Sequence, residues 1–442
     1  MHHHAAIIVV LLSAAFVACR PMRAGEPCPV DPGLIASLEQ GVGLEEIEPE
    51  KGGGYQVDTP FGFPTDEHLA LLAEVPNVRV FYCRDEFSPA AWRHVGKLSS
   101  LEVLMAEGPN IVDEDLLCLG DLPQLQQLIV RSYGRSRKRF GDAALPPIRA
   151  MKRLERLALE SDAMTDKGLK HLADLHSLQV LELRGGFGDE GVAALANLHQ
   201  LRRLVLRGKF TDKALSSLRE LEKLESLTLI SPSLRGERLG ELAHLPHLRS
   251  LKFCGGEHAT LAGLRRWPAL RVLNLASPST GDALLASLGE TPRLTSLSLE
   301  SSSVSDEGLA ALKNFPVLEE LDLQNTAVTD AGMKHLTSLK QLHSLRIGNV
   351  ERETLIGGSG LADVASLPSL SVLDISYIDL RDCRLAMLAG AGRPQSLVFN
   401  RKDATVTLDW KRLQQLRPRL SSRAESVITE ATALDFPVRI AR

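Results

Sequence analysis

One six-residue pattern, LxxLxL, returns at a nearly constant spacing along most of this 442-residue chain. Three consecutive copies begin at Leu294, Leu318 and Leu342, each 24 residues after the one before. Further copies begin at Leu154, Leu178, Leu201, Leu224, Leu248, Leu270 and Leu370, and weaker ones at Val78, Leu101 and Leu125. A unit of this length cannot bury its own apolar face, so the repeat predicts stacked units that share one continuous core.

Each unit has two halves with different periods. The LxL half alternates with period two, which is typical of a strand. In the second half, such as Thr329–Leu339, apolar residues recur three and four positions apart, which is typical of a helix. A Thr or Ser followed by Asp opens this half and provides side-chain oxygens for the free amides of a helix start. We therefore interpret the recurring aspartates as structural caps: Asp66, Asp113, Asp142, Asp166, Asp189, Asp212, Asp282, Asp306 and Asp330.

Across residues 76–400 these units resemble the leucine-rich repeat family. They are most similar to bacterial proteins with LxxLxLxxTxVTDxGLxxLxxL units, of the ribonuclease-inhibitor-like repeat subtype. The resemblance implies an α/β solenoid shaped like a horseshoe, with a parallel β-sheet on the concave face and short helices on the convex face. It also implies that partners bind the concave face. One departure is that Thr326, Ser302 or Asp162 stands where many members have Asn, so hydroxyl or carboxylate groups are expected to replace the usual side-chain ladder.

The chain divides into four parts on this reading. Residues 1–18 resemble a signal peptide, and residues 19–75 form an N-terminal segment and cap with a degenerate repeat. Residues 76–400 hold about 12–13 leucine-rich repeats, and residues 401–442 form a C-terminal cap and tail. Both ends are expected to act as lids, because an open sheet edge would recruit other chains.

The N-terminus resembles a targeting signal, with two departures from the usual form. Ala5–Ala18 is a 14-residue apolar run, too short to span a bilayer comfortably but suited to the core of a signal peptide. Phe16–Cys19 resembles a bacterial lipoprotein box, which predicts lipidation of Cys19 and membrane attachment through it. The box usually has Leu where Phe16 stands, and no Lys or Arg precedes the apolar run. We expect export to the cell envelope or periplasm; an uncleaved segment, or a start at Met22 that leaves the protein in the cytoplasm, are the alternatives.

The side chains that the repeat does not need should carry function. In each LxxLxL strand the residues beside the fourth-position leucine point away from the core and should line the concave sheet. Arginines gather there with exposed apolar residues, a composition typical of interface centres, and acidic residues follow further along. The partner-binding candidates are Ile129, Arg131, Arg156, Arg184, Arg203, Val205, Arg207, Glu300, Asp322 and Asp374. The alternative is that these charges only keep the sheet soluble, with Glu160 and Glu182 pairing some of the arginines.

A basic insertion lengthens the unit that starts at Leu125. Five of the nine residues in Arg131–Arg139 are Lys or Arg. They are suited to phosphate or an anionic membrane surface, or they form a solvated loop. The formal net charge of −4 and the pI near 6.4 argue against a general nucleic-acid binder.

The sequence contains no recognisable catalytic motif beyond the residues that the repeat itself explains. The six cysteines are scattered without a CxxC pair, and no metal-ligand spacing or phosphate-binding loop is present. We therefore expect a non-catalytic protein–protein interaction module without cofactor or metal, whose partner has an acidic patch. The alternatives are a substrate-recognition adaptor of a ubiquitin-ligase-like system and a structural cell-envelope lipoprotein. The sequence identifies neither the partner nor the oligomeric state.

Overall fold

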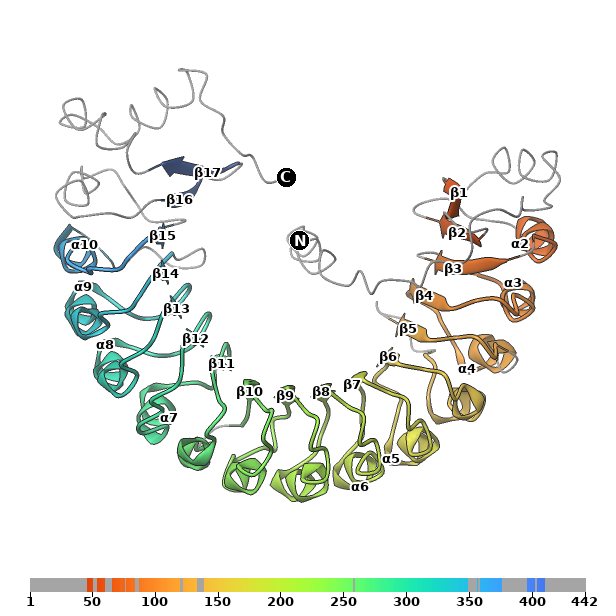
Figure 1. Cartoon of the computed structure of the whole chain (residues 1–442), viewed down its shortest axis with the longest axis horizontal. Coiled ribbons are helices and arrows are strands. Elements are labelled where there is room, and N and C mark those ends of the chain that lie inside the picture. The colour runs from red at the N-terminus through yellow and green to blue at the C-terminus, as the bar shows by residue number, and fades with distance from the viewer. Residues whose placement is uncertain are drawn as a thin grey trace, which may run out of the picture.

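The computed structural model describes residues 46–50, 54–59, 66–75, 77–83, 87–119, 122–132, 139–256, 259–348, 356, 358–375, 396–401 and 404–409. The strands in this part of the chain form one 17-stranded sheet. Each strand from β2 to β15 pairs in parallel with the next strand along the chain. At the two ends, β1 pairs with β2 and β16 pairs with β17 in antiparallel fashion. The sheet lines the inner side of an arc and the helices lie on its outer side (Figure 1). The predicted leucine-rich repeat solenoid is confirmed.

The strands shorten from six residues in β2 to β5 to three in β11 to β15, and β16 and β17 again have six. Their bounds are β1 (Glu46–Glu50), β2 (Gly54–Thr59), β3 (Val78–Cys83), β4 (Val103–Gly108), β5 (Gln127–Ser132), β6 (Arg156–Glu160), β7 (Val180–Arg184), β8 (Arg203–Arg207), β9 (Ser226–Ile230), β10 (Ser250–Cys254), β11 (Val272–Asn274), β12 (Ser296–Ser298), β13 (Glu320–Asp322), β14 (Ser344–Arg346), β15 (Val372–Asp374), β16 (Ser396–Arg401) and β17 (Ala404–Asp409).

Short α-helices and 3₁₀ helices form the convex side. The α-helices are α2 (Asp66–Leu72), α3 (Pro89–Val95), α4 (Asp113–Leu116), α5 (Asp166–Leu169), α6 (Asp189–Ala193), α7 (Asp282–Ser287), α8 (Asp306–Leu309), α9 (Asp330–Met333) and α10 (Gly358–Ala365). The 3₁₀ helices are η2 (Leu117–Leu119), η3 (Asp142–Ala144), η4 (Ile148–Ala150), η5 (Lys170–Leu172), η6 (Asp212–Leu218), η7 (Leu239–Leu242), η8 (Ala262–Arg266), η9 (Ala310–Asn314) and η10 (Lys334–Ser338).

The leucines of the repeat form the core, and neighbouring strands hold them in register. Leu297, Leu321 and Leu345 pair across β12, β13 and β14, and all three are buried. Burying one such side chain contributes about 1.5–3 kcal/mol. Phe187 and Phe210 add stacked rings with centroids 6.2 Å apart. The core therefore runs unbroken along the arc, as the repeat predicts.

The recurring aspartates join neighbouring coils, which corrects our interpretation of them as simple caps. Thr329 caps α9 itself, because its Oγ1 accepts a hydrogen bond from the Ala331 amide at 3.2 Å. Asp306, one coil earlier, accepts from the Thr329 amide at 2.7 Å and from Thr329 Oγ1 at 2.5 Å. The same bridge to the following coil starts from Asp66, Asp113, Asp142, Asp166, Asp189, Asp212, Asp282 and Asp330. A ladder of carboxylates thus stabilises the stack of coils.

The glycine of the Thr-Asp-x-Gly junction makes room for this ladder. A Cβ on Gly332 would lie 2.3 Å from Asp306 Oδ1, closer than atoms can approach. Similar clashes arise with the carboxylate of the preceding coil at Gly168, Gly191, Gly308 and Gly360. Alanine takes this position in two coils, at Ala144 and Ala214, and there the segments are the 3₁₀ helices η3 and η6. The motif therefore reflects packing between coils.

Buried hydroxyls follow the LxL pattern, as expected, but not at every predicted position. Ser302 and Thr326 are both 5% exposed, and Thr326 Oγ1 donates to the Leu323 carbonyl at 2.7 Å. In the third case the buried residue is Ser161, whose Oγ donates to the Phe140 carbonyl, and not the predicted Asp162. The Asp162 side chain is 63% exposed, since in this coil the chain turns inward one residue earlier.

Several predictions lie outside the described residues. These are the signal-like segment 1–18, the lipidation candidate Cys19, most of the basic insertion (133–138) and the C-terminal tail from residue 410. Among the helices that are described, none combines the length and hydropathy of a membrane-spanning helix.

Candidate functional site

The register of the sheet brings seven of the predicted site residues together on β5 to β8. Ile129, Ala158, Glu182 and Val205 occupy equivalent positions on these four strands. Arg131, Glu160, Arg184 and Arg207 form the next row toward the ends of the strands. Arg156 and Arg203 lie in the row on the other side of Val205 and Glu182. Glu300, Asp322 and Asp374 lie on the same concave face, but at the C-terminal half of the arc.

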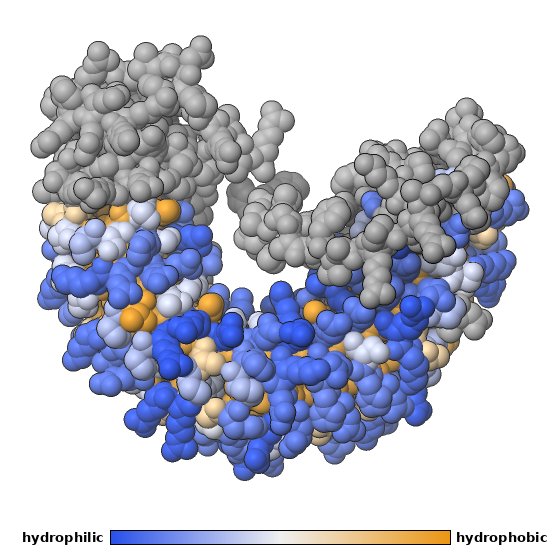
Figure 2. All heavy atoms as spheres, viewed as in Figure 1, coloured by the Kyte–Doolittle hydropathy of each residue, from blue (hydrophilic) through white to orange (hydrophobic). Residues whose placement is uncertain are grey.

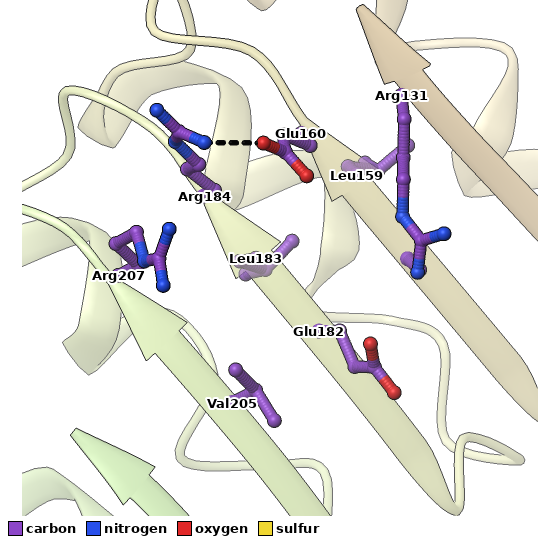
Figure 3. A pocket seen from close by; sticks show the side chains of 9 residues that line it. Arg131, Leu159, Glu160, Glu182, Leu183, Arg184, Val205 and Arg207 are labelled. Carbon is purple, nitrogen blue, oxygen red and sulfur yellow. Dashed lines mark hydrogen bonds and ion pairs between the residues drawn. The ribbon is translucent and has the colours of Figure 1, made fainter. Parts of the chain in front are cut away.

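A shallow hollow of about 170 Å³ opens in the middle of the first group. Its floor comes from strands β6 and β7, and arginines from β5, β7 and β8 surround it (Figure 3). The lining residues are Arg131, Ala158, Leu159, Glu160, Glu182, Leu183, Arg184, Val205 and Arg207. A space-filling view shows that the outer surface of the arc is mainly hydrophilic and that the arc curves around an open inner side (Figure 2). The hollow is a small depression of the concave surface, lined by both charged and apolar side chains.

Most arginines around the hollow form ion pairs with glutamates on adjacent strands. Arg156 Nη2 lies 2.9 Å from Glu182 Oε1, and Arg184 Nη1 lies 2.5 Å from Glu160 Oε1. On β5, Arg131 Nη1 lies 2.5 Å from an oxygen of Glu107. Glu160 and Glu182 thus pair some of the arginines, as the alternative interpretation of the sequence expected. The pairing also holds the arginine side chains in fixed orientations along the sheet.

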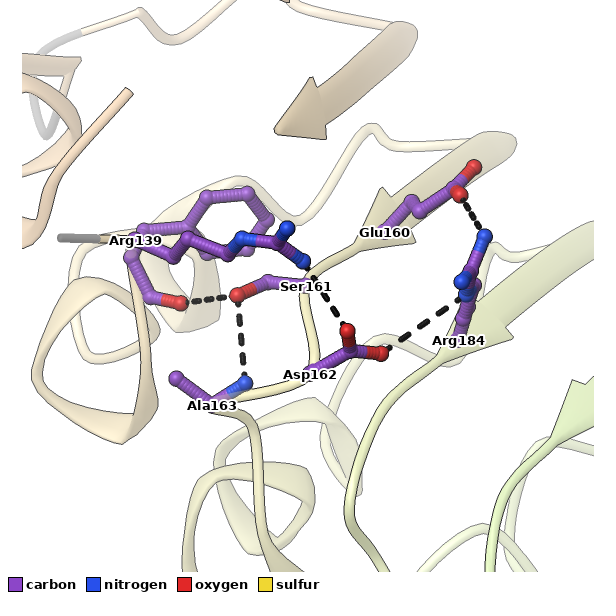
Figure 4. Close-up of polar contacts among 7 residues, drawn as sticks. Arg139, Glu160, Ser161, Asp162, Ala163 and Arg184 are labelled. Atoms are coloured by element: carbon purple, nitrogen blue, oxygen red, sulfur yellow. Dashed lines mark hydrogen bonds and ion pairs between the residues drawn. The ribbon is translucent and has the colours of Figure 1, made fainter. Parts of the chain in front are cut away.

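A chain of ion pairs leads from the hollow to the basic insertion. Arg184 contacts Asp162 at 3.7 Å as well as Glu160, and Arg139, at the end of the insertion, donates to Asp162 at 2.9 Å (Figure 4). Arg139 follows β5, Glu160 ends β6, Asp162 follows it by two residues, and Arg184 ends β7. The end of the insertion at Arg139 is thus fixed beside the hollow.

Arg207 differs from its neighbours. It is exposed, and no ion pair or hydrogen bond involves its guanidinium within the described part of the chain. Arg203, on the same strand, is also exposed and reaches Glu182 only at 3.9 Å. Between them, Val205 is partly exposed at the rim of the hollow. Arg207 and Val205 are therefore the charged and apolar groups most available to a partner here.

The expectation of an exposed Ile129 is wrong. Its side chain is only 6% exposed. Parallel strands place neighbouring side chains about 4.8 Å apart, so Met105 and Ala158 stand directly beside it in register. Ile129 contributes to packing of the concave face and not to an open apolar surface.

The acidic candidates lie in a partly dehydrated setting. Burial raises the pKa of the Asp322 carboxyl, opposed by a hydrogen bond from the Gln324 amide at 3.0 Å and by Arg346 at 3.3 Å. Partial dehydration inside the arc raises the pKa of Glu300, and the nearby Asp322 adds to this effect. Asp374 lies next to Arg346 in register. Asp322 thus has a structural role at the end of β13, whereas Glu300 is exposed.

The structure adds two residues that sequence reasoning did not single out. Val272 on β11 and Val372 on β15 are 39% and 36% exposed and lie in one row of the concave sheet, with Glu320 between them on β13. They immediately precede the second leucine of their LxxLxL copies, the position that Arg156 and Arg203 occupy in theirs. The row of the concave face that holds Arg156 and Arg203 on β6 and β8 therefore carries exposed valines on β11 and β15.

No cluster of three or more His, Cys, Asp or Glu residues in the described ranges has the arrangement of a metal site. Of the charged residues that line the hollow, Arg131, Glu160, Glu182 and Arg184 each form an ion pair, and Arg207 does not within the described residues. The chemistry that the arrangement offers is hydrogen bonding and charge complementarity.

Parts of this chain are similar to known proteins. Residues 143–327 match the family model described as a leucine-rich repeat region. A solved internalin from Listeria monocytogenes is 21% identical, with a TM-score of 0.47, over 84% of this chain and 94% of that one. A leucine-rich repeat protein from Leptospira interrogans is 18% identical, with a TM-score of 0.40, over 80% of this chain and 85% of that one. No curated protein sequence gives a significant match.

Proposed function

We propose that this protein is a non-catalytic binding module that holds a protein partner on the concave face of its solenoid, around β5 to β8. The observation that carries the proposal is that the exposed Arg207 and the partly exposed Val205 lie at the rim of a hollow whose other charges are paired. Arginine beside an aliphatic side chain is typical of the centre of protein interfaces.

The physical advantage of this surface is preorganisation. The in-register sheet and the ion pairs of Arg156 and Arg184 fix the orientation of the side chains before a partner arrives. Immobilising a long side chain on binding costs about 0.5–1.5 kcal/mol, so a surface already fixed loses less entropy. Because Arg207 lacks an anionic partner in the described residues, we propose that a carboxylate of the bound protein pairs with it.

The proposal is tested by charge reversal with a matched control. Arg207→Glu should abolish or weaken capture of a specific partner from cell extract. Lys213→Glu makes the same change in net charge on the convex side of the same coil, in η6, and should leave capture unchanged. Both residues are exposed, so the thermal unfolding of both variants should match the wild type. Equal capture by Arg207→Glu and the wild type would refute the assignment of this face.

Cell-envelope attachment through Cys19 is a separate part of the proposal. It is supported by the lipoprotein-like box Phe16–Cys19. The intact mass of the native protein should then correspond to a chain beginning at Cys19 with acyl groups, found in the membrane fraction. An unmodified mass beginning at Met1 or Met22 would refute it.

A further inference from the structure

We infer that the concave face binds an elongated protein segment with opposite charges at its two ends, the acidic end over β5 to β8 and the basic end over β12 to β15. The inference rests on the proposed binding role of this face and specifies the chemistry of the partner.

The N-terminal half of the surface is basic. The concave positions of β5 to β8 carry five arginines and two glutamates: Arg131, Arg156, Arg184, Arg203, Arg207, Glu160 and Glu182. Ion pairs neutralise much of this charge, but Arg207 and the loosely held Arg203 are exposed. The remaining positive charge is thus concentrated on β8.

The C-terminal half is acidic. The concave positions of β12 to β15, with the residue two positions after β12, carry four carboxylates and one arginine: Glu300, Glu320, Asp322, Asp374 and Arg346. Arg346 pairs with Asp322 and lies next to Asp374 in register, and Lys252 on β10 contributes a further positive charge near Glu300. Glu300 and Glu320 are exposed, and the exposed Val272 and Val372 lie on the strands at either side. This half is suited to a basic segment with aliphatic groups.

The surface between the two halves is mostly uncharged. Ser226, Thr228, Ser250 and Asn274 face the concave side on β9 to β11, and Lys252 is the one charged residue at these positions. From β8 to β13 the sheet advances five strands, or about 24 Å at about 4.8 Å per strand. An α-helix of about 16 residues covers that distance. The occupant is therefore a segment of at least this length with its charges at the ends.

Opposite charges on one face discriminate between partners. A uniformly acidic partner such as a nucleic acid or an anionic membrane gains attraction at β8 and meets repulsion at β12 to β15. A uniformly basic partner meets the reverse. Only a segment with separated charges gains at both ends.

The test uses a synthetic helical peptide of about 20 residues, with four glutamates near one end, four lysines near the other and no net charge. Its binding to the full chain is measured by fluorescence anisotropy at low salt, where charge interactions are least screened. One variant inverts the basic half (Arg203→Glu with Arg207→Glu), another inverts the acidic half (Glu300→Lys with Glu320→Lys), and a third inverts both. Lys167→Glu with Lys213→Glu, on the convex side, is the control.

Inverting either half should weaken binding about tenfold, because exposed ion pairs are replaced by like charges. Inverting both halves should restore it, since the peptide can then lie in the opposite direction. The control should bind as the wild type does. All the altered side chains are exposed, so a thermal unfolding curve verifies that each variant folds.

Loss of binding in the doubly inverted variant, or unchanged binding in either half-inverted variant, would overturn the inference. That outcome leaves the proposed function intact if capture of the natural partner still depends on Arg207. Capture that does not depend on Arg207 would instead refute the proposed function itself.

Discussion

Replacing Gly332 by alanine should destabilise the solenoid only while Asp306 is present. The added Cβ would lie 2.3 Å from Asp306 Oδ1 and 3.0 Å from Val328 Cγ1, so the carboxylate must move. Overpacking of this kind costs about 1–3 kcal/mol. Movement of the carboxylate also weakens its hydrogen bonds to the Thr329 amide and hydroxyl, each worth about 1.5–3 kcal/mol for a charged acceptor.

The magnitude follows from a double-mutant cycle. We expect a loss of about 2 kcal/mol for Gly332→Ala and of about 3 kcal/mol or more for Asp306→Ala, which removes both hydrogen bonds. In the Asp306→Ala background the clash with the carboxylate is gone, and alanine in a helix is favoured over glycine by up to about 1 kcal/mol. The second substitution should then be neutral or slightly stabilising, which gives a coupling energy of about 2 kcal/mol.

Urea unfolding followed by circular dichroism measures this coupling, provided that the variants share one denaturant dependence. Gly281 is a matched control, because a Cβ there would meet no atom within 4 Å. Gly281→Ser should therefore be neutral or slightly stabilising in either background. Additive losses for Gly332→Ala and Asp306→Ala would refute the claim that the glycine exists to admit the carboxylate.

Three further outcomes are expected. Asp115 is 3% exposed, and burial raises the pKa of its carboxyl from 3.8 to about 6, so protonation of Asp115 favours the folded state. This contribution to the free energy of unfolding is present below pH 4 and is lost as the pH rises through 6. The Asp115→Asn variant should therefore have a larger free energy of unfolding than the wild type, and the difference should grow with pH to about 2–3 kcal/mol at pH 7. A difference that stays constant across a pH series would contradict this. Gly188→Thr should raise the free energy of unfolding in urea by about 0.5–1 kcal/mol, because the threonine hydroxyl would donate to Asp166 as Thr211 donates to Asp189. A lower stability would count against the proposed role of the carboxylate ladder. Arg184→Ala should lower the melting temperature more than Arg207→Ala does, since only Arg184 is held by Glu160 and Asp162, and equal melting temperatures would show that those pairs contribute nothing.

Much of the fold could be predicted from local sequence, because each unit repeats one packing solution. The fourth-position leucines and the residues beside them occupy the predicted rows, from Tyr82 on β3 to Asp374 on β15. What sequence reasoning did not reveal is how coils contact one another. Asp306 pairs with a residue 23 positions later, which no pattern within one unit indicates.

The exception at Asp115 shows the same dependence on neighbours. Asp115 stands at the position that Gly168, Gly191, Gly308 and Gly332 occupy in their coils, and its Oδ2 accepts from the Val112 amide at 2.9 Å. The coil before it has Pro89, not Asp, directly after the capping Ser88. No carboxylate from that coil needs the space, so a side chain fits there.

The candidate site was harder to predict, because exposure depends on adjacent strands. Arginines 131, 156 and 184 were placed correctly on the concave face, but their pairing with particular glutamates follows from the register of the strands. The same register buries Ile129 between Met105 and Ala158. Val272 and Val372 are exposed because their neighbours in the row include small serines.

The central claim is that the inner wall of the arc holds a protein partner. The most direct measurement places a photo-crosslinking residue at position 205 on the concave β8, or at position 213 on the convex η6, and analyses the adducts formed in cells by mass spectrometry. The account predicts adducts to one recurrent protein from position 205 and none from position 213. Adducts to a recurrent protein from position 213 alone would contradict it.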